Sequence, residues 1–468
     1  MNVELIQFFT IILFVIGILQ YLNKSDEFVL LLVVFFYLTG IARYNAVISG
    51  KANWVDVAYA REIFFLTDDL AIEALGYFFM GTAVLSISYL LLNLHKPKYK
   101  LIDDNKILGE FLKSKQKLII WLYIFFLIVN GYSNRVMSSV HYSQQSVGVG
   151  YFFLFKLAIG GLILLFFMLF KNLPKNKRFL RFVYLVAMIL AASSTYNMTS
   201  RFQFLSWMMA LIFIIVGRSN IITKSIFYAA GGIVVLILFL IAGNKRTMMF
   251  ANLTTEQEIE YAKERFAMAE DQNMLDGFMM VMQVYPEYLD FGYGSEHFEI
   301  LLRPIPRAIW PDKPVGGYAN KLGLNEGLPG TVGISQSIYG TFYGEGGPIA
   351  IVIFCIIYAF IFTKLFNTTL KYGSDMRHLL HGIIFASAVP ILRGGDLPGI
   401  VAFIGMSYWP VFIFLYLYKK HLKHLARKEK IKETNEKSKQ PTINAKLDNM
   451  PTQYALNQPH YPDAIQQK

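Results

Sequence analysis

The chain has 468 residues, of which 55% are hydrophobic and only 16% are charged, and its mean hydropathy is +0.42. A soluble protein of this length carries closer to a quarter charged residues, so the composition excludes an ordinary soluble globular protein. The net charge of +12 would suggest nucleic acid as a partner of a soluble protein, but Lys and Arg concentrated on the cytoplasmic side of a membrane protein explain it, and we expect no nucleic-acid partner.

Apolar runs of about 20 residues recur along the chain, and each is long enough to cross a bilayer as a helix. The runs are continuous and do not alternate, which argues against a membrane β-barrel. The first run lacks a basic start and a cleavage site, so we interpret it as a membrane helix and not as a signal peptide. We therefore predict an all-α polytopic membrane protein with about eleven transmembrane helices. The predicted spans are 5–23, 27–47, 70–94, 117–136, 151–170, 181–198, 202–217, 225–243, 346–366, 377–393 and 398–418.

Basic segments set the predicted orientation of these spans. Dense Lys and Arg occur in 95–117, in 171–178, in 217–224 and after Tyr418. With eleven spans all of these segments lie on one side, which the positive-inside rule makes cytoplasmic, and the N-terminus lies outside. Residues 419–468 are poor in large apolar residues, so we predict a disordered basic cytoplasmic tail, whose start suits anionic membrane lipid as well as solvent.

This topology divides the chain into an eight-span bundle (1–243), a large external loop (244–345), three further spans (346–418) and the tail (419–468). Loops longer than about 15 residues are usually functional or disordered. The external loop is rich in aromatic and rigid residues, so we predict that it is ordered and functional. Its first part has helical periodicity up to Pro286.

The stretch LLRPIPRAIWPDKP (301–314) is rigid and cationic, because its prolines exclude a regular helix. Arginine is disfavoured on the outer side of a membrane, so a collection of arginines there is informative. Guanidinium groups bind phosphate in bidentate geometry, which suggests a pyrophosphate site. Snorkelling to the interface or pairing with carboxylates is the alternative. The arginines predicted on the outer side are Arg201, Arg246, Arg303, Arg307 and Arg393.

The candidate general bases on the outer side are Glu345 in FYGEGG, Asp396 in RGGDLPG and His297 in SEHF. A carboxylate such as Glu345 also suits a helix N-terminus, and Asp396 is close enough in sequence to pair with Arg393. Metal chemistry finds little support, because there is no D-x-D motif and the HLLH sequence at 378–381 lacks a third ligand. We therefore expect neither a metal nor another cofactor.

Aromatic side chains accompany the external loop, and they suit either the apolar faces of sugar rings or the membrane interface. Composition alone leaves both interpretations open. The aromatic residues in question are Tyr293, Trp310, Tyr318, Tyr339 and Tyr343.

Taken together, these segments resemble the O-antigen polymerase family of bacterial oligosaccharide repeat-unit polymerases. The resemblance is carried by TSRFQF (199–204), RPIPRAIWPDKP (303–314), YGTFYGEGG (339–347) and RGGDL (393–397), and their order covers most of residues 1–420. It implies a GT-C-type helical bundle in the bacterial cytoplasmic (inner) membrane. It also implies an inverting, metal-independent glycosyltransferase that joins undecaprenyl-pyrophosphate-linked repeat units on the periplasmic side. A flippase and a chain-length regulator are the implied partners.

The residues agree with such chemistry. Pyrophosphate is a good leaving group, so the site must chiefly stabilise developing negative charge, and fixed cations do this well. We expect the prolines to hold Arg303 and Arg307 at the pyrophosphate, Trp310 to lie at the interface and Lys313 to add charge at the rim. An O-antigen ligase would use the same chemistry with another acceptor. A transporter or flippase is the third alternative, although we find no internal repeat of the kind that many transporters show.

Overall fold

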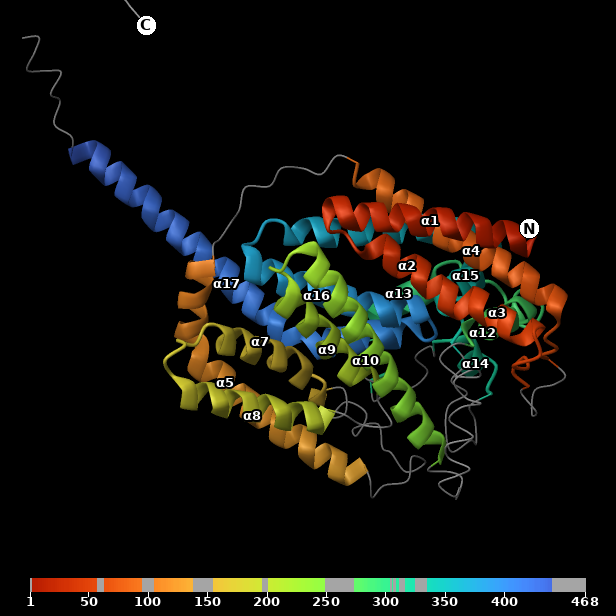
Figure 1. Cartoon of the computed structure of the whole chain (residues 1–468), viewed down its shortest axis with the longest axis horizontal. Coiled ribbons are helices and arrows are strands. Elements are labelled where there is room, and N and C mark those ends of the chain that lie inside the picture. The colour runs from red at the N-terminus through yellow and green to blue at the C-terminus, as the bar shows by residue number, and fades with distance from the viewer. Residues whose placement is uncertain are drawn as a thin grey trace, which may run out of the picture. The chain divides into compact units, whose positions relative to one another are not determined.

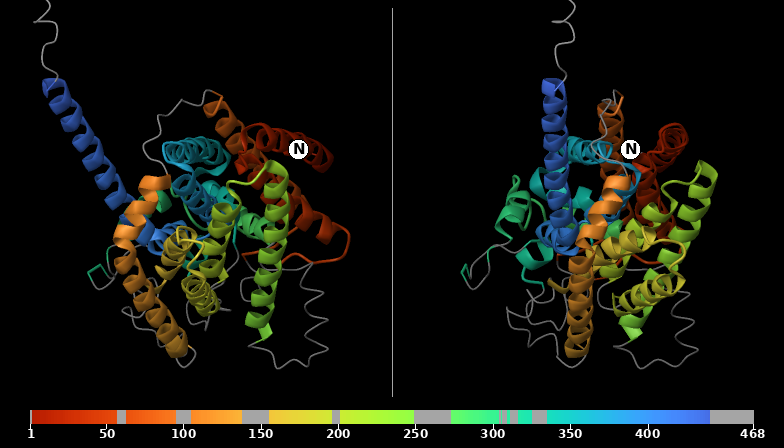
Figure 2. Two further views of the ribbon diagram at one scale, coloured as in Figure 1. Left: turned by 60° about the vertical axis from the view of Figure 1, so that its left-hand side comes forward. Right: turned by 90° about the vertical axis from the view of Figure 1, so that its left-hand side faces the viewer.

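The computed structural model describes residues 2–56, 63–94, 105–137, 155–195, 201–248, 273–303, 305, 309–310, 316–324 and 335–439, and every regular element in these ranges is a helix. Figures 1 and 2 show their arrangement. The elements are α1 (Val3–Lys24), α2 (Phe28–Phe36), the π-helix η1 (Tyr37–Ile41), α3 (Ala42–Ile48), α4 (Asp68–Leu92), α5 (Asn105–Met137), α7 (Ile159–Lys171), α8 (Arg178–Thr195), α9 (Arg201–Val216), α10 (Ile221–Met248), α12 (Met274–Val284), α13 (Ser295–Leu302), α14 (Tyr318–Lys321), α15 (Ser337–Thr369), α16 (Ser374–Arg393) and α17 (Leu397–Lys439).

Several of these helices are long and apolar enough to cross a membrane, so the chain is a helical, multi-pass membrane protein. Among the described residues six helical segments meet this description: Val3–Lys24, Phe28–Ile48, Asp68–Leu92, Arg178–Thr195, Ser337–Thr369 and Leu397–Lys432. Helices also overlie the other predicted spans, but some of them are shorter, such as Ile159–Lys171. The count of eleven spans therefore stays a prediction.

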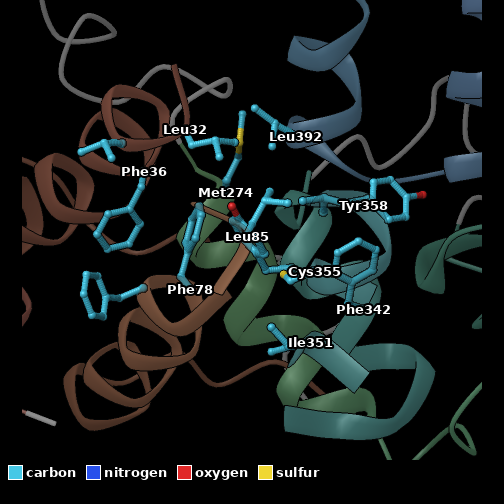
Figure 3. Close-up of a cluster of buried hydrophobic side chains, with 14 of the residues drawn as sticks. Leu32, Phe36, Phe78, Leu85, Met274, Phe342, Ile351, Cys355, Tyr358 and Leu392 are labelled. Carbon is cyan, nitrogen blue, oxygen red and sulfur yellow. The ribbon is translucent and has the colours of Figure 1, made fainter. Parts of the chain in front are cut away.

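The core lies where α4, α12 and α15 meet. Figure 3 shows buried side chains of α2, α4, α12, α15 and α16 in one cluster, among them Leu32, Phe78, Met274, Ile351 and Leu392. Helix α12 belongs to the predicted external loop, yet nearly all of its residues are buried against α4 and α15. Part of this loop is thus an integral layer of the bundle, and one compact unit extends over Met1–Leu415.

Two sets of contacts join loops that the predicted topology places on the same side of the membrane. At the predicted cytoplasmic end, Asp375 binds Lys171 at 2.7 Å and Arg218 at 2.8 Å. At the predicted outer end, the side-chain amide of Gln283 donates to the carbonyl of Phe65 at 2.6 Å. Two of the basic segments predicted to be cytoplasmic, those with Lys171 and Arg218, therefore meet at one carboxylate.

A buried ion pair ties α12 to α3. The guanidinium of Arg43 binds the carboxylate of Asp276 through Nε at 2.9 Å and Nη2 at 2.8 Å, and the two side chains are 1% and 0% exposed. The backbone N–H of Val55 donates to the same carboxylate at 2.9 Å, and Arg43 Nη2 donates to the carbonyl of Asn53 at 2.6 Å. These bonds fix the start of α12 on the bundle.

The predicted disordered tail is partly helical. Helix α17 continues from the membrane to Lys439, so the prediction of disorder was wrong for residues 419–439, and residues 440–468 lie outside the described part. The reason is physical: Lys, Arg and Glu are good helix formers, and they extend a helix that the preceding apolar segment has already nucleated.

Candidate functional site

Helix α13 carries charge on one side and apolar residues on the other. Glu296, Glu299 and Arg303 are spaced i, i+3 and i+7, so they share one face of the helix. Phe298 and Leu301 lie on the opposite face and are 61% and 72% exposed. The usual amphipathic pattern of a surface helix is thus reversed, with charges toward the protein and apolar groups outward. Such a helix suits a hydrocarbon environment and not water.

Glu345 holds the N-terminus of α13. Its carboxylate accepts hydrogen bonds from the backbone N–H of Gly294 and, at 2.9 Å, from that of Glu296. The first N–H groups of a helix lack partners within the helix, and a carboxylate there also suits the helix dipole. We predicted Glu345 as a general base at the start of its own span. In the structure both of its oxygens cap α13. Its role as a base stays a prediction.

A break in α15 places this carboxylate. The helical geometry is interrupted at Gly346 and Gly347 and resumes at Pro348, so Glu345 is the last residue of a short outer segment. Gly347 has φ of +66°, a conformation that favours glycine over other residues. The YGEGGP sequence therefore separates an outer helical turn, which belongs to the site, from the helix that enters the membrane.

His297 packs against the same helix. Its ring stacks on that of Phe354 with centroids 4.1 Å apart and an angle of 4°, and its Nδ1 lies 3.6 Å from the Glu345 carboxylate. Within the described residues neither ring nitrogen forms a hydrogen bond. His297 thus packs α13 on α15. Its role as a base stays a prediction.

Arg303 lies at the turn between α16 and α17. Its Nη2 is 3.1 Å from Oδ2 of Asp396, whose Oδ1 accepts the backbone N–H of Gly399 at 3.1 Å in the first turn of α17. Arg393 ends α16 and begins this RGGD turn. The turn packs tightly on α15, since a Cβ at Gly394 would lie 2.1 Å from the carbonyl oxygen of Ser337. Arg303 therefore contacts the turn that Arg393 begins, although the two arginines are far apart in sequence.

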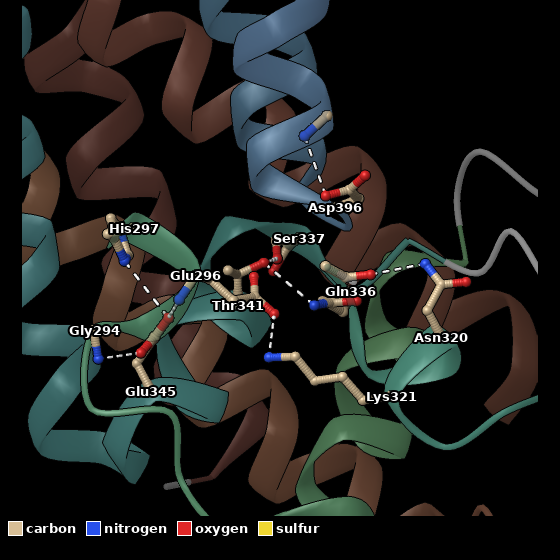
Figure 4. A network of polar contacts seen from close by, with 12 residues as sticks. Gly294, Glu296, His297, Asn320, Lys321, Gln336, Ser337, Thr341, Glu345 and Asp396 are labelled. Carbon is tan, nitrogen blue, oxygen red and sulfur yellow. Dashed lines mark hydrogen bonds and ion pairs between the residues drawn. The ribbon is translucent and has the colours of Figure 1, made fainter. Parts of the chain in front are cut away.

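Lys321 joins the network of polar contacts shown in Figure 4, and with Glu296, Glu299, Arg303, Glu345 and Asp396 it forms what we call the charged cluster. Its Nζ lies 3.3 Å from Oε1 of Glu296, which is almost fully buried. Burial raises the pKa of Glu296 to about 7; the nearby carboxylates of Glu345 and Glu299 act in the same direction, and Lys321 opposes them. Burial also raises the pKa of Glu299, with Lys321 opposing it. The cluster therefore holds carboxyl groups that bind protons more tightly than exposed ones do.

The other predicted cations are not all described. Arg307 and Lys313 lie outside the described residues. Arg201 begins α9 and Arg246 lies in the last turn of α10, but their side chains are also outside the described part. Their predicted contact with pyrophosphate stays a prediction.

The predicted aromatic contacts divide into two kinds. Trp310 is 36% exposed and remains available to a ligand or to the interface. Tyr343 is partly buried, with its ring 5.9 Å from that of Phe278. Tyr339 is 1% exposed and fills the space beside Gly81 of α4, so it is a core residue and we do not retain it as a sugar contact.

Sequence reasoning missed Glu296, Glu299 and Lys321. The signal was present in SEHFEILLR (295–303), where two glutamates and an arginine recur at helical spacing beside exposed apolar residues. Lys321 gave no signal, because only the fold brings α14 to α13.

No family model, no curated protein and no solved structure matches this chain. A functional assignment therefore depends on the chemistry of the site. The arrangement offers fixed guanidinium groups, carboxyl groups with raised proton affinity and an outward apolar surface on one short helix. These are the elements needed to bind an amphipathic anion and to move a proton beside it.

Proposed function

We propose that this protein polymerises undecaprenyl-pyrophosphate-linked oligosaccharide repeat units of O-antigen or a related surface polysaccharide. The transfer is an inverting, metal-independent glycosyl transfer on the periplasmic side of the bacterial inner membrane. The proposed architecture has eleven transmembrane helices in a GT-C-type bundle. A flippase would supply the repeat units, and a chain-length regulator would act with the polymerase.

The reversed amphipathicity of α13 carries this proposal. A lipid-linked sugar diphosphate has a hydrocarbon chain, an anionic diphosphate and a polar glycan joined in series. Phe298 and Leu301 offer an apolar surface to the hydrocarbon, while Arg303 on the other face offers a cation to the diphosphate. Few other classes of substrate require both surfaces on one short helix.

Arg303 suits the leaving group of this reaction. As the glycosidic bond breaks, negative charge grows on the diphosphate, and a cation fixed beforehand stabilises that charge without reorganisation. A guanidinium has five N–H donors in a fixed planar fork, which suits phosphate oxygens, and Asp396 holds this one through Nη2 at 3.1 Å. Arg393, at the head of the same turn, supplies a second positive charge.

The decisive experiment replaces Arg303 with alanine in a strain that lacks its own copy of the gene. A hydrogen bond to a charged group contributes about 1.5–3 kcal/mol, which corresponds to a loss of roughly 10- to 150-fold in rate. The surface glycan, separated on a gel, should shift from long chains toward a single repeat unit. The matched control is Arg178→Ala, an exposed arginine on the predicted cytoplasmic side, which should leave long chains unchanged.

The same strain separates the alternatives. Deletion of a polymerase leaves lipid A core with one repeat unit, whereas deletion of a ligase leaves it with none. Movement of an intact lipid-linked unit across vesicles that contain the purified protein, without formation of a new bond, would instead indicate a transporter. Long chains from an Arg303→Ala protein present at normal amount would contradict the assigned role of this residue.

A further inference from the structure

Glu299 lies on the charged face of α13, one turn before Arg303. Glutamate and arginine at positions i and i+4 commonly pair on a helix. Here the Arg303 guanidinium binds Asp396 at 3.1 Å, and Glu299 forms no hydrogen bond or ion pair with a described residue. Its side chain is only partly buried, so a ligand at the charged face can reach it.

The groups around Glu299 set its affinity for protons. Burial raises its pKa; Asp396 and Glu345 add to the increase, while Lys321 and Arg303 oppose it. A base works best when its pKa approaches the operating pH, so such a carboxylate is a stronger base than an exposed glutamate. The charged groups that face it are Glu296 and Arg303 on α13, Lys321 on α14, Glu345 on α15 and Asp396 before α17.

The other carboxylates of the cluster are occupied. Glu345 accepts two backbone N–H groups of the α13 N-terminus, and Asp396 binds Arg303 and the first turn of α17. Glu296 is almost fully buried and faces the ammonium group of Lys321. Among the described residues, Glu299 therefore combines access from outside with an unpaired carboxylate.

We propose that Glu299 is the catalytic base of the glycosyl transfer, an inference that rests on the proposed polymerase function. Its carboxylate takes the proton of the acceptor hydroxyl while the hydroxyl oxygen attacks the anomeric carbon. The electron pair of that oxygen forms the new glycosidic bond. The old bond to the diphosphate breaks, and its electron pair leaves with undecaprenyl pyrophosphate beside Arg303. The proton then passes from Glu299 to water.

The spacing on α13 suits an inverting reaction. Side chains one turn apart on a helix have Cβ atoms about 5–6 Å apart. Inverting hydrolysis by paired carboxyl groups needs a separation of about 6.5–9.5 Å, because a nucleophile must fit between the base and the sugar. Glu299 and Arg303 lie one turn apart on one helix, so the distance between their backbone positions is fixed. The base then serves the acceptor side of the sugar and the cation serves the leaving group.

The test uses the purified full-length protein with undecaprenyl-pyrophosphate-linked repeat units from a strain that lacks the gene. For Glu299→Gln we expect kcat to fall by about 10²- to 10⁴-fold, the usual contribution of a general base, with unchanged binding of the lipid-linked unit. Glu299→Asp should keep intermediate activity, which a purely structural role would not predict. The matched control is Glu287→Gln, an exposed glutamate of the same external loop, which should equal wild type.

The pH profile gives a second readout. The wild-type rate should rise with pH as Glu299 loses its proton, and this rise should disappear in Glu299→Gln. A Glu299→Gln protein that elongates chains at the wild-type rate overturns the assignment of the base but leaves the polymerase proposal standing. A wild-type protein that elongates no chains overturns the polymerase proposal itself. If Glu299→Gln unfolds, the folded Glu299→Asp variant decides, and wild-type kcat in it counts against the base.

Discussion

Replacement of Asp276 by alanine should strongly destabilise the protein. Its carboxylate is fully buried and accepts hydrogen bonds from Arg43 Nε at 2.9 Å, from Arg43 Nη2 at 2.8 Å and from the backbone N–H of Val55 at 2.9 Å. Without it the Arg43 guanidinium stays buried as an uncompensated charge. Removal of one partner of a buried pair costs about 3–5 kcal/mol, so we expect the free energy of unfolding to fall by that amount.

The assay is denaturant unfolding of the purified protein in detergent, with linear extrapolation to zero denaturant. The matched variant is the double replacement Arg43→Met with Asp276→Leu, which removes both charges at once. Buried pairs replaced by apolar residues of similar volume are often neutral in stability, so the double variant should be far closer to wild type than Asp276→Ala is. An Asp276→Ala protein as stable as wild type would refute the reasoning, and so would equal losses in the single and double variants.

Two further predictions concern the core and the charged cluster. Gly81→Ala in α4 should lower the free energy of unfolding by about 1–3 kcal/mol through overpacking, because the new Cβ would lie 2.3 Å from the Tyr339 ring. Gly76→Ala in the same helix meets no atom within 4 Å and should be neutral or stabilising. Thermal unfolding of both variants checks this, and equal behaviour of the two would contradict it. Burial raises the pKa of Glu296 from 4.5 to about 7, so the folded protein binds this proton more tightly than the unfolded chain does. The stability that follows is complete below about pH 4.5 and is lost as the pH rises through about 7. In Glu296→Gln the free energy of unfolding should depend less on pH between about pH 4.5 and 7. An unchanged pH dependence would show that another group causes it.

Hydrophobicity predicted the class of helical membrane protein because long apolar runs are a matter of local composition. Apolar runs alone indicated helices able to cross a bilayer, and basic segments indicated which loops share a side, as the contacts of Asp375 with Lys171 and Arg218 agree. The prolines in 301–314 predicted that this stretch is not a regular helix, and α13 ends at Leu302, at the start of the stretch. The tail was mispredicted because low apolar content indicates the absence of a core, and a helix that continues from a membrane span does not need one.

The site was harder to predict, because the role of a side chain depends on partners distant in sequence. Asp396 was expected near Arg393 from their spacing, yet it binds Arg303, which lies 93 positions away in the chain. Glu345 has an acidic group at a helix boundary, but the helix that it caps is α13, which no local pattern specifies. Tyr339 looked like a ligand contact because it lies in a motif rich in aromatics, and only the packing of α4 shows it to be buried.

The break at Gly346 and Gly347 links the position of α13 to that of α15. Glu345 lies just before the break in α15 and binds the first turn of α13. The position of α13, and with it that of Arg303, therefore depends on the position of α15. Asp396, at the head of another membrane helix, fastens the opposite end of α13. The two ends of α13 are therefore held by the heads of two different helices, and a shift of either helix would carry Glu299 and Arg303 with it.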